Sequence, residues 1–154
     1  MLLYKNRIVV TGGSGRFGSL FKLNLNNKKY NYFFPTKKKL NILNQKSILK
    51  YLKINKPKYL IHMAGLSRPM NIHEKNINKS IDLNIIGTAN ITKCCSLLGI
   101  KLIFFSTAYV YPGISGNYRE DSSINPINNY GLSKMGGEAA VRMYNNSLIL
   151  RISM

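Results

Sequence analysis

The chain has 154 residues, of which 45% are hydrophobic, and its 23 lysines and arginines against 5 acidic residues give a formal net charge of +18. This length suffices for a buried core, and we expect one domain over residues 1–154. A run of about 18 apolar residues is absent, which excludes a membrane-spanning helix. The first residues lack a signal-peptide pattern, so we expect a cytoplasmic protein with no membrane partner.

The positive charge invites a nucleic-acid interpretation, which the rest of the sequence does not favour. The lysines are spread along the chain apart from clusters at 28–29 and 37–39, and few aromatic residues alternate with them as in single-strand binding grooves. The chain is rich in Lys, Asn and Ile, which A/T-rich codons encode, and this bias is a sufficient explanation of the charge. We therefore expect no nucleic-acid partner, while a basic surface attracts anions such as a dinucleotide or a sugar nucleotide.

Strand-like and helix-like segments alternate along the chain, which predicts an α/β fold with a parallel sheet covered on both faces. In chain order we expect six strands, at about residues 7–10, 30–34, 40–43, 59–63, 101–106 and 147–152. We expect helices at about 15–26, 45–54, 77–98 and 130–144, and a loop rich in Gly, Ser, Asn and Pro at 112–128. A doubly wound sheet predicts the strand order 3-2-1-4-5-6, with the ligand crevice at the carboxyl ends of the strands.

Two adjacent cysteines, Cys94 and Cys95, lie in an apolar segment that we expect to be helical. Neighbouring side chains on a helix point apart, and neither cysteine has a partner at a spacing typical of metal ligands. We therefore predict reduced, buried thiols, as in cytoplasmic proteins, and no metal site.

A branched apolar run, Ile8–Val10, ends in a glycine cluster that precedes a helix-compatible segment. A dinucleotide-binding turn requires this strand–turn–helix context. The glycines fit two registers, G-x-G-x-x-G with Gly13, Gly15 and Gly18, or T-G-x-x-G-x-x-G with Gly12 in place of Gly13. In both registers the glycines let the backbone approach a pyrophosphate at the helix N-terminus. A glycine turn without a ligand is the alternative interpretation.

Tyr130 and Lys134 are four residues apart in a segment that we expect to be helical, so their side chains share one face. The phenol of a free tyrosine titrates near pH ~10. A fixed ammonium a few ångströms away favours the phenolate and lowers that pKa toward neutral pH. The pair is therefore a candidate for proton transfer, although the same spacing is also common on solvated helices.

Six segments, in the family's order, resemble the extended short-chain dehydrogenase/reductase superfamily, also called the NAD-dependent epimerase/dehydratase superfamily. The dTDP-4-dehydrorhamnose reductase and sugar-nucleotide epimerase branches are the most similar. The matching segments are 11–18, 61–65, 84–90, 105–111, 130–138 and 150–153. The resemblance implies a doubly wound Rossmann fold with three αβα layers. It also implies an NAD(P)-dependent oxidoreductase or epimerase that acts on a nucleotide-activated sugar.

By this resemblance, Tyr130 is the general acid or base, and Lys134 lowers its pKa and holds the cofactor ribose. Thr107, at the end of a strand, stabilises the charge that develops on the substrate oxygen. The residues that the resemblance implies for cofactor binding are Gly12, Gly15, Arg16, Phe17, Gly18, Ala64, Gly65 and Lys134.

Several residues near the expected catalytic residues have a structural interpretation as well as a functional one. Ser106 supports the strand end or assists the threonine that follows it. Glu138 either pairs with Lys134 or is a structural or solvated carboxylate. We expect His62 to be a satisfied core histidine, and Asn84 matches a family position that orders the active site, with a polar helix surface as its alternative.

The choice of cofactor depends on the end of the second expected strand. An NAD site usually has an acidic residue about 20 positions after the glycines, which binds the ribose 2′-hydroxyl. Residues 34–38 contain no acid, whereas Arg16 and Lys37 are suited to a 2′-phosphate. We expect NADP, with a slight preference over NAD.

Two departures from the family bear on function. Ala108 follows Thr107, at a position where the rhamnose-type reductases carry an aspartate. An alanine at this position is more typical of the epimerases, and it argues against a dehydratase. Family members also continue past residues 151–153 into a C-terminal region that binds most of the nucleotide sugar. We therefore expect that this substrate region is missing, and that the chain is a truncated product, a fragment or half of a split enzyme.

Two classes of function stay open. One is a sugar-nucleotide reductase or epimerase, which the set of Thr107, Tyr130 and Lys134 favours. The other is a non-catalytic dinucleotide-binding module, or an inactive fragment that requires a partner chain, which the short length favours. The sequence leaves the oligomeric state open, and the resemblance implies a homodimer formed through the two long helices.

Overall fold

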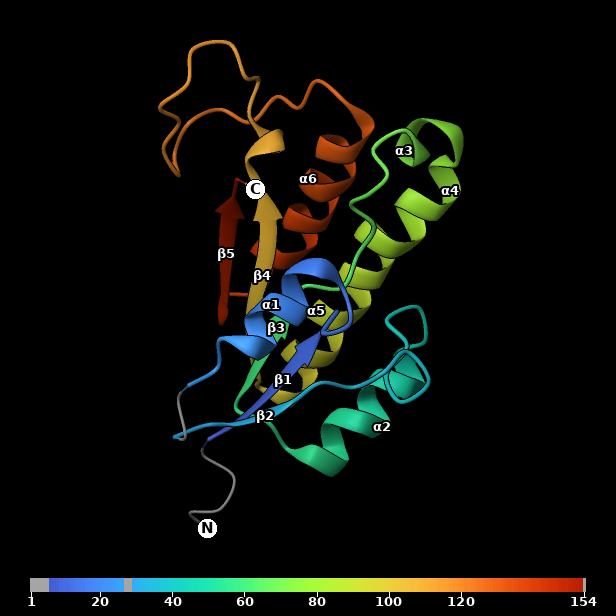
Figure 1. Ribbon diagram of the computed structural model, residues 1–154. Helices are drawn as coiled ribbons and strands as arrows, with labels where there is room; N and C mark the ends of the chain where they lie inside the picture. Colours follow the sequence, from blue (N-terminus) through green and yellow to red (C-terminus); the bar gives the residue numbers. More distant parts are fainter. Residues whose placement is uncertain (1–5, 27–28, 154) are drawn as a thin grey trace.

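Five parallel strands form a sheet with helices on both of its faces (Figure 1). The computed structural model describes residues 6–26 and 29–153. Neighbouring strands are hydrogen-bonded in the order β2-β1-β3-β4-β5, and every pair is parallel. The strands are β1 (Arg7–Thr11), β2 (Asn31–Phe33), β3 (Tyr59–His62), β4 (Lys101–Thr107) and β5 (Ser147–Ile152). This arrangement confirms the Rossmann-like α/β fold, and it brings the carboxyl ends of all strands to one edge.

Asparagine caps and a left-handed glycine set several helix ends. The Asn44 side chain accepts a hydrogen bond from Ser47 N at 3.0 Å, and the Asn128 side chain accepts one from Gly131 N at 2.8 Å. Gly99 ends the helix α5 (Gly87–Leu98) with a φ of 65°. In the described part of the chain, no helix combines the length and apolar character needed to cross a membrane. The helices are α1 (Arg16–Leu23), α2 (Gln45–Asn55), α3 (Ile72–Lys75), α4 (Ile77–Ser80), the π-helix η1 (Ile81–Ile86), α5 (Gly87–Leu98), the 3₁₀-helix η2 (Ala108–Val110) and α6 (Asn129–Arg142).

The strand expected at residues 40–43 is wrong, because this segment forms turns. Leu40 N donates to Thr36 O at 3.0 Å, so its backbone is satisfied locally rather than by a neighbouring strand. Leu40 and Ile42 nevertheless bury their side chains in the core. That burial produces the apolar alternation that predicts a strand. Without this strand, the expected order of the other five is the observed one.

The core has one part on each face of the sheet. Ile8, Val10 and Ile61 point toward the α1 face, where Phe21 of α1 packs against them. Val9, between two of them in β1, points to the opposite face, as the alternation of a strand requires. That second part contains residues of α2, α5 and α6, including the expected buried, free thiols of Cys94 and Cys95.

The helix expected over residues 77–98 is present, but its middle is π-helical. The π segment η1 carries Asn84, whose side chain is 1% exposed. A Cβ on Gly137 of α6 would lie 2.7 Å from Asn84 O, so the glycine allows α6 to approach η1 closely. Helices α5 and α6 therefore lie together on one face, and α6 reaches the carboxyl end of β4 (Figure 1).

Candidate active site

A cleft of about 560 Å³ opens at the carboxyl ends of β1, β3 and β4. Ligands of doubly wound sheets bind at this edge. The structure brings to the cleft every residue that the sequence predicts for cofactor binding or catalysis. They are Gly12, Gly15, Arg16, Phe17, Gly18, Ala64, Gly65, Thr107, Tyr130 and Lys134.

The turn between β1 and α1 requires glycine at two of the predicted positions. Gly12 has a φ of +76°, and a Cβ there would lie 2.6 Å from Ala64 N. A Cβ on Gly18 would overlap the carbonyl oxygen of Gly12. Gly13 is not among the residues with positive φ. The geometry thus favours the register with Gly12, Gly15 and Gly18, and it places the N-terminus of α1 against the cleft.

Among the described residues, all charged side chains that line the cleft are cationic. Arg16 and Lys37 lie toward the glycine turn and the end of β2, and Arg68 and Lys134 line the part nearer Tyr130. A pyrophosphate and a 2′-phosphate are anions that such side chains and a helix N-terminus attract. The residues of the cleft therefore fit a dinucleotide, and they fit one with a 2′-phosphate.

Thr107 and Tyr130 meet at the end of β4. The Tyr130 phenol lies beside the Thr107 hydroxyl, which opposes the rise of the phenol's pKa, and the Thr107 hydroxyl accepts from Tyr109 N at 3.3 Å. The Tyr130 ring lies between His73 and Tyr109, with centroid distances of 5.0 and 5.7 Å. The phenol is thus held in one orientation, with its oxygen beside a second hydroxyl at the cleft.

The pKa of Tyr130 differs from the expectation that Lys134 lowers it. Burial raises this pKa above its ordinary value and Tyr109 adds to the rise, while the hydrogen bond with Thr107 and the charge of Arg68 oppose it. The Lys134 ammonium is instead committed to a backbone carbonyl, and burial of the phenol dominates. Tyr130 therefore stays protonated at neutral pH, which suits a proton donor.

Lys134 is a buried cation, only 8% exposed. Its Nζ donates to Phe105 O at 2.7 Å and lies 4.2 Å from the centre of the Phe104 ring. Burial lowers its pKa to about 8, against an opposing effect of the Glu138 charge. The group is thus charged at neutral pH, and an ammonium has two further N–H donors for a ligand.

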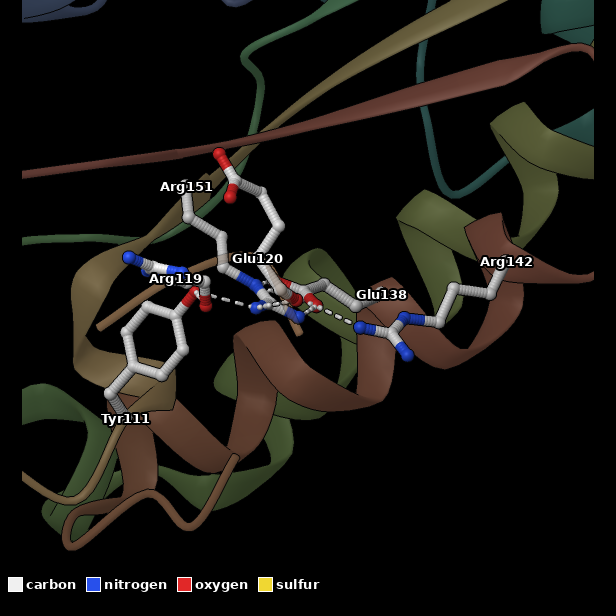
Figure 2. A network of polar contacts seen from close by, with 6 residues as sticks. All are labelled: Tyr111, Arg119, Glu120, Glu138, Arg142 and Arg151. Carbon is white, nitrogen blue, oxygen red and sulfur yellow. Dashed lines mark hydrogen bonds and ion pairs between the residues drawn. The ribbon is translucent and has the colours of Figure 1, made fainter. Parts of the chain in front are cut away.

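Glu138 pairs with Arg151, and not with Lys134 (Figure 2). Its buried carboxylate accepts from Arg151 Nε at 3.0 Å and Nη2 at 2.8 Å, while exposed Arg142 lies 3.7 Å away. Arg151 Nη1 also donates to the Tyr111 hydroxyl at 2.7 Å and to the backbone oxygen of residue 120 at 3.3 Å. The network therefore joins α6 and β5 to the beginning and the middle of the segment that follows η2.

Asn84 and Ser133 form a polar bridge beneath Tyr130. Asn84 Oδ1 accepts from Leu66 N at 2.6 Å, and Asn84 Nδ2 donates to Leu66 O at 2.9 Å and to Ser133 Oγ at 2.8 Å. Ser133 Oγ donates to Tyr130 O at 2.8 Å. This geometry excludes the solvated-surface alternative for Asn84. Sequence reasoning missed Ser133, although its position three residues after Tyr130 was a usable signal.

His73 is a second residue of the site, and nothing in the sequence indicates its partner. It is fully buried, its Nδ1 lies 2.7 Å from Ser80 Oγ, and its ring contacts Tyr130. Next to it, the Glu74 carboxylate accepts from Asn129 N at 3.3 Å, which ties α3 to the first turn of α6. No local sequence pattern predicts the contact of His73 with Tyr130, because that contact depends on how the loop after β3 folds over α6.

His62 is the satisfied core histidine that the sequence predicts. Its Nδ1 lies 2.7 Å from Thr11 Oγ1 and its Nε2 lies 3.2 Å from Thr88 Oγ1. Burial, with a smaller effect of the Lys134 charge, lowers its pKa to about 3. The imidazole of His62 therefore stays neutral at neutral and mildly acidic pH.

Protonation of His62 in the unfolded chain should lower the free energy of unfolding by about 2 kcal/mol between pH 7 and pH 5. The unfolded chain binds a proton at this histidine below about pH 6.5, whereas the folded protein binds it only near pH 3. Acid therefore stabilises the unfolded state. Urea unfolding at the two pH values measures the change, and His62→Gln should lose less stability on acidification. An equal loss in both proteins would contradict this.

Known proteins are similar to this chain over nearly all of its residues. Residues 6–154 match the family model described as RmlD substrate binding domain. The methionine adenosyltransferase 2 subunit beta of Xenopus laevis is 32% identical over 154 residues, which cover 95% of this chain and 46% of that protein. The spore coat polysaccharide biosynthesis protein SpsK of Bacillus subtilis (strain 168) is 30% identical over 149 residues, which cover 96% and 52%.

A solved structure shows the same fold. The dTDP-4-dehydrorhamnose reductase of Bacillus anthracis in complex with NADP superimposes with a TM-score of 0.89 and 32% sequence identity, over 96% of this chain and 53% of that one. The chain thus spans about half the length of the relatives that it matches. Since the family model matches nearly all of its residues, the chain belongs to the RmlD substrate binding domain family.

Proposed function

We propose that this chain binds a nicotinamide dinucleotide and takes part in hydride transfer to or from a nucleotide-activated sugar, as a reductase or an epimerase. One observation carries the proposal: the glycine turn lines the same cleft as Thr107, Tyr130 and Lys134. A pure binding site has no need of a phenol, a hydroxyl and a buried ammonium that line one cleft together. The similar reductase in complex with NADP supports the same assignment.

Each side chain has a distinct part in the reaction. The cofactor, when bound, supplies or accepts the hydride. In the reductive direction Tyr130 donates its phenolic proton to the oxygen of the substrate carbonyl, which becomes a hydroxyl. Thr107 donates a hydrogen bond to that oxygen as charge develops on it. Lys134 donates to ligand hydroxyls, and the positive charge of Arg68 favours the phenolate that remains on Tyr130.

The test is oxidation of NADPH, followed by absorbance, with a panel of dTDP- and UDP-linked 4-keto sugars. Turnover with a member of the panel is the expected result. Tight NADPH binding without turnover on any member would instead favour a binding module. Absence of NADPH binding by the folded chain would overturn the proposal.

A non-catalytic module that works with a partner chain is the second candidate. The relative named as a subunit of methionine adenosyltransferase 2, at 32% identity, favours it. So does the length of the chain, which spans about half of that relative. In this case the cleft binds the dinucleotide without reaction, and the partner chain carries the activity.

We propose NADP rather than NAD as the preferred cofactor, because Arg16 and Lys37 line the cleft. Replacing either with glutamine should weaken NADPH binding about tenfold, the usual worth of a charge-assisted contact, and change NADH binding little. Titration of the bound cofactor's fluorescence measures both affinities. Lys39→Gln is the matched control, since Lys39 is exposed and does not line the cleft. Equal losses for the two cofactors would contradict the preference.

A further inference from the structure

The Ser106 hydroxyl has no hydrogen-bond partner among the described residues, although it is buried. The residue is 3% exposed and lines the cleft. Nearly all buried polar groups in proteins are hydrogen-bonded, so an exception at a binding cleft calls for an explanation. Its neighbour Thr107 differs, because that hydroxyl accepts a hydrogen bond from Tyr109 N. Ser106 therefore does not support the strand end by a hydrogen bond, which was one interpretation of it.

The position of Ser106 places it next to Lys134. Alternate residues of a strand point to the same face, so Ser106 shares the face of Phe104 in β4. The Lys134 ammonium lies over the Phe104 ring and donates to Phe105 O, the carbonyl that directly precedes Ser106. A buried hydroxyl and a buried ammonium thus occupy adjacent places at one end of the cleft.

We infer that Ser106 is a ligand-binding residue whose hydroxyl, beside Lys134, hydrogen-bonds to the ribose that carries the nicotinamide. This inference rests on the proposed function. A ribose offers neighbouring hydroxyls that each donate and accept, while an ammonium only donates. The serine hydroxyl can both donate and accept, so the two protein groups together match a ribose better than Lys134 alone. The ligand supplies the partner that the folded chain does not.

Ser106→Ala separates this role from a structural one. The ligand-free variant loses no hydrogen bond, so its melting temperature should equal or exceed that of the unaltered chain. Its affinity for NADPH should fall about fivefold, the effect of one neutral hydrogen bond. Its affinity for 2′,5′-ADP should not change, because this fragment lacks the nicotinamide ribose. Ser96→Ala, on the exposed surface of α5, is the control.

Three results with the variant would overturn the inference. Equal NADPH affinity of the variant and the unaltered chain would show that the hydroxyl makes no contact with the ligand. Equal weakening of NADPH and 2′,5′-ADP binding would show an indirect effect, and a lowered melting temperature would show a structural role. If the unaltered chain bound neither ligand, the proposed function would fail and the inference with it. Unchanged NADPH binding by the variant would leave the proposed function intact.

Discussion

Replacing Tyr130 with phenylalanine is expected to lower the rate of carbonyl reduction by about 10²- to 10⁴-fold, the usual worth of a general acid. The substitution removes one oxygen and keeps the ring between His73 and Tyr109, whose centroids lie 5.0 and 5.7 Å away. The fold and the cofactor site should therefore be preserved. Because burial raises the pKa of this phenol, the unaltered residue is protonated and able to donate at neutral pH.

Single-turnover oxidation of bound NADPH measures the effect of Tyr130→Phe on the chemical step, and a fluorescence titration measures cofactor affinity. Tyr32→Phe is a suitable control, because Tyr32 lies in β2 and does not line the cleft. A fall in turnover with unchanged NADPH affinity is the expected pattern. Turnover within a few-fold of the unaltered chain would show that another group supplies the proton.

Replacing Arg151 with methionine should lower the free energy of unfolding by about 3–5 kcal/mol, because it leaves a buried carboxylate without its partner. Glu138 is 1% exposed, and Arg151 Nε and Nη2 donate to its carboxylate. The double variant Arg151→Met with Glu138→Gln should regain part of this loss, since it removes the unpaired charge. The cost thus arises from the charge left behind as well as from the lost contacts.

Urea unfolding at neutral pH measures these losses. Arg142→Met is the matched control, because Arg142 contacts the same carboxylate at 3.7 Å with a side chain that is 55% exposed. An exposed pair contributes about 0–1 kcal/mol. If Arg151→Met cost no more than Arg142→Met, the buried pair would not be the connection between α6 and β5 that the geometry indicates.

Much of the site could be predicted because its chemistry is local in the sequence. The glycine turn follows directly after β1, and Tyr130 and Lys134 share one helix face. Their partners could not be predicted in the same way. Glu138 of α6 had Lys134 at a helical spacing, but Arg151, thirteen residues away in β5, holds its carboxylate.

The remaining errors also have a tertiary cause. Leu40 and Ile42 fill the core from a turn, and a sequence window does not distinguish that burial from a strand. The direction of the Tyr130 pKa depends on how far the fold buries the phenol, which the spacing to Lys134 does not show. The position of His73 depends on the loop after β3, for which no periodic pattern exists.

Arg151 also fixes the segment that follows η2, through the hydroxyl of Tyr111 and the backbone oxygen of residue 120. Ordering a chain segment costs conformational entropy of about 1–2 kcal/mol per residue. Here the contacts of Arg151 offset part of that cost within the fold itself, and they hold Tyr111 and residue 120 in fixed positions relative to β5. The same side chain that neutralises a buried carboxylate thus also immobilises part of the segment after η2.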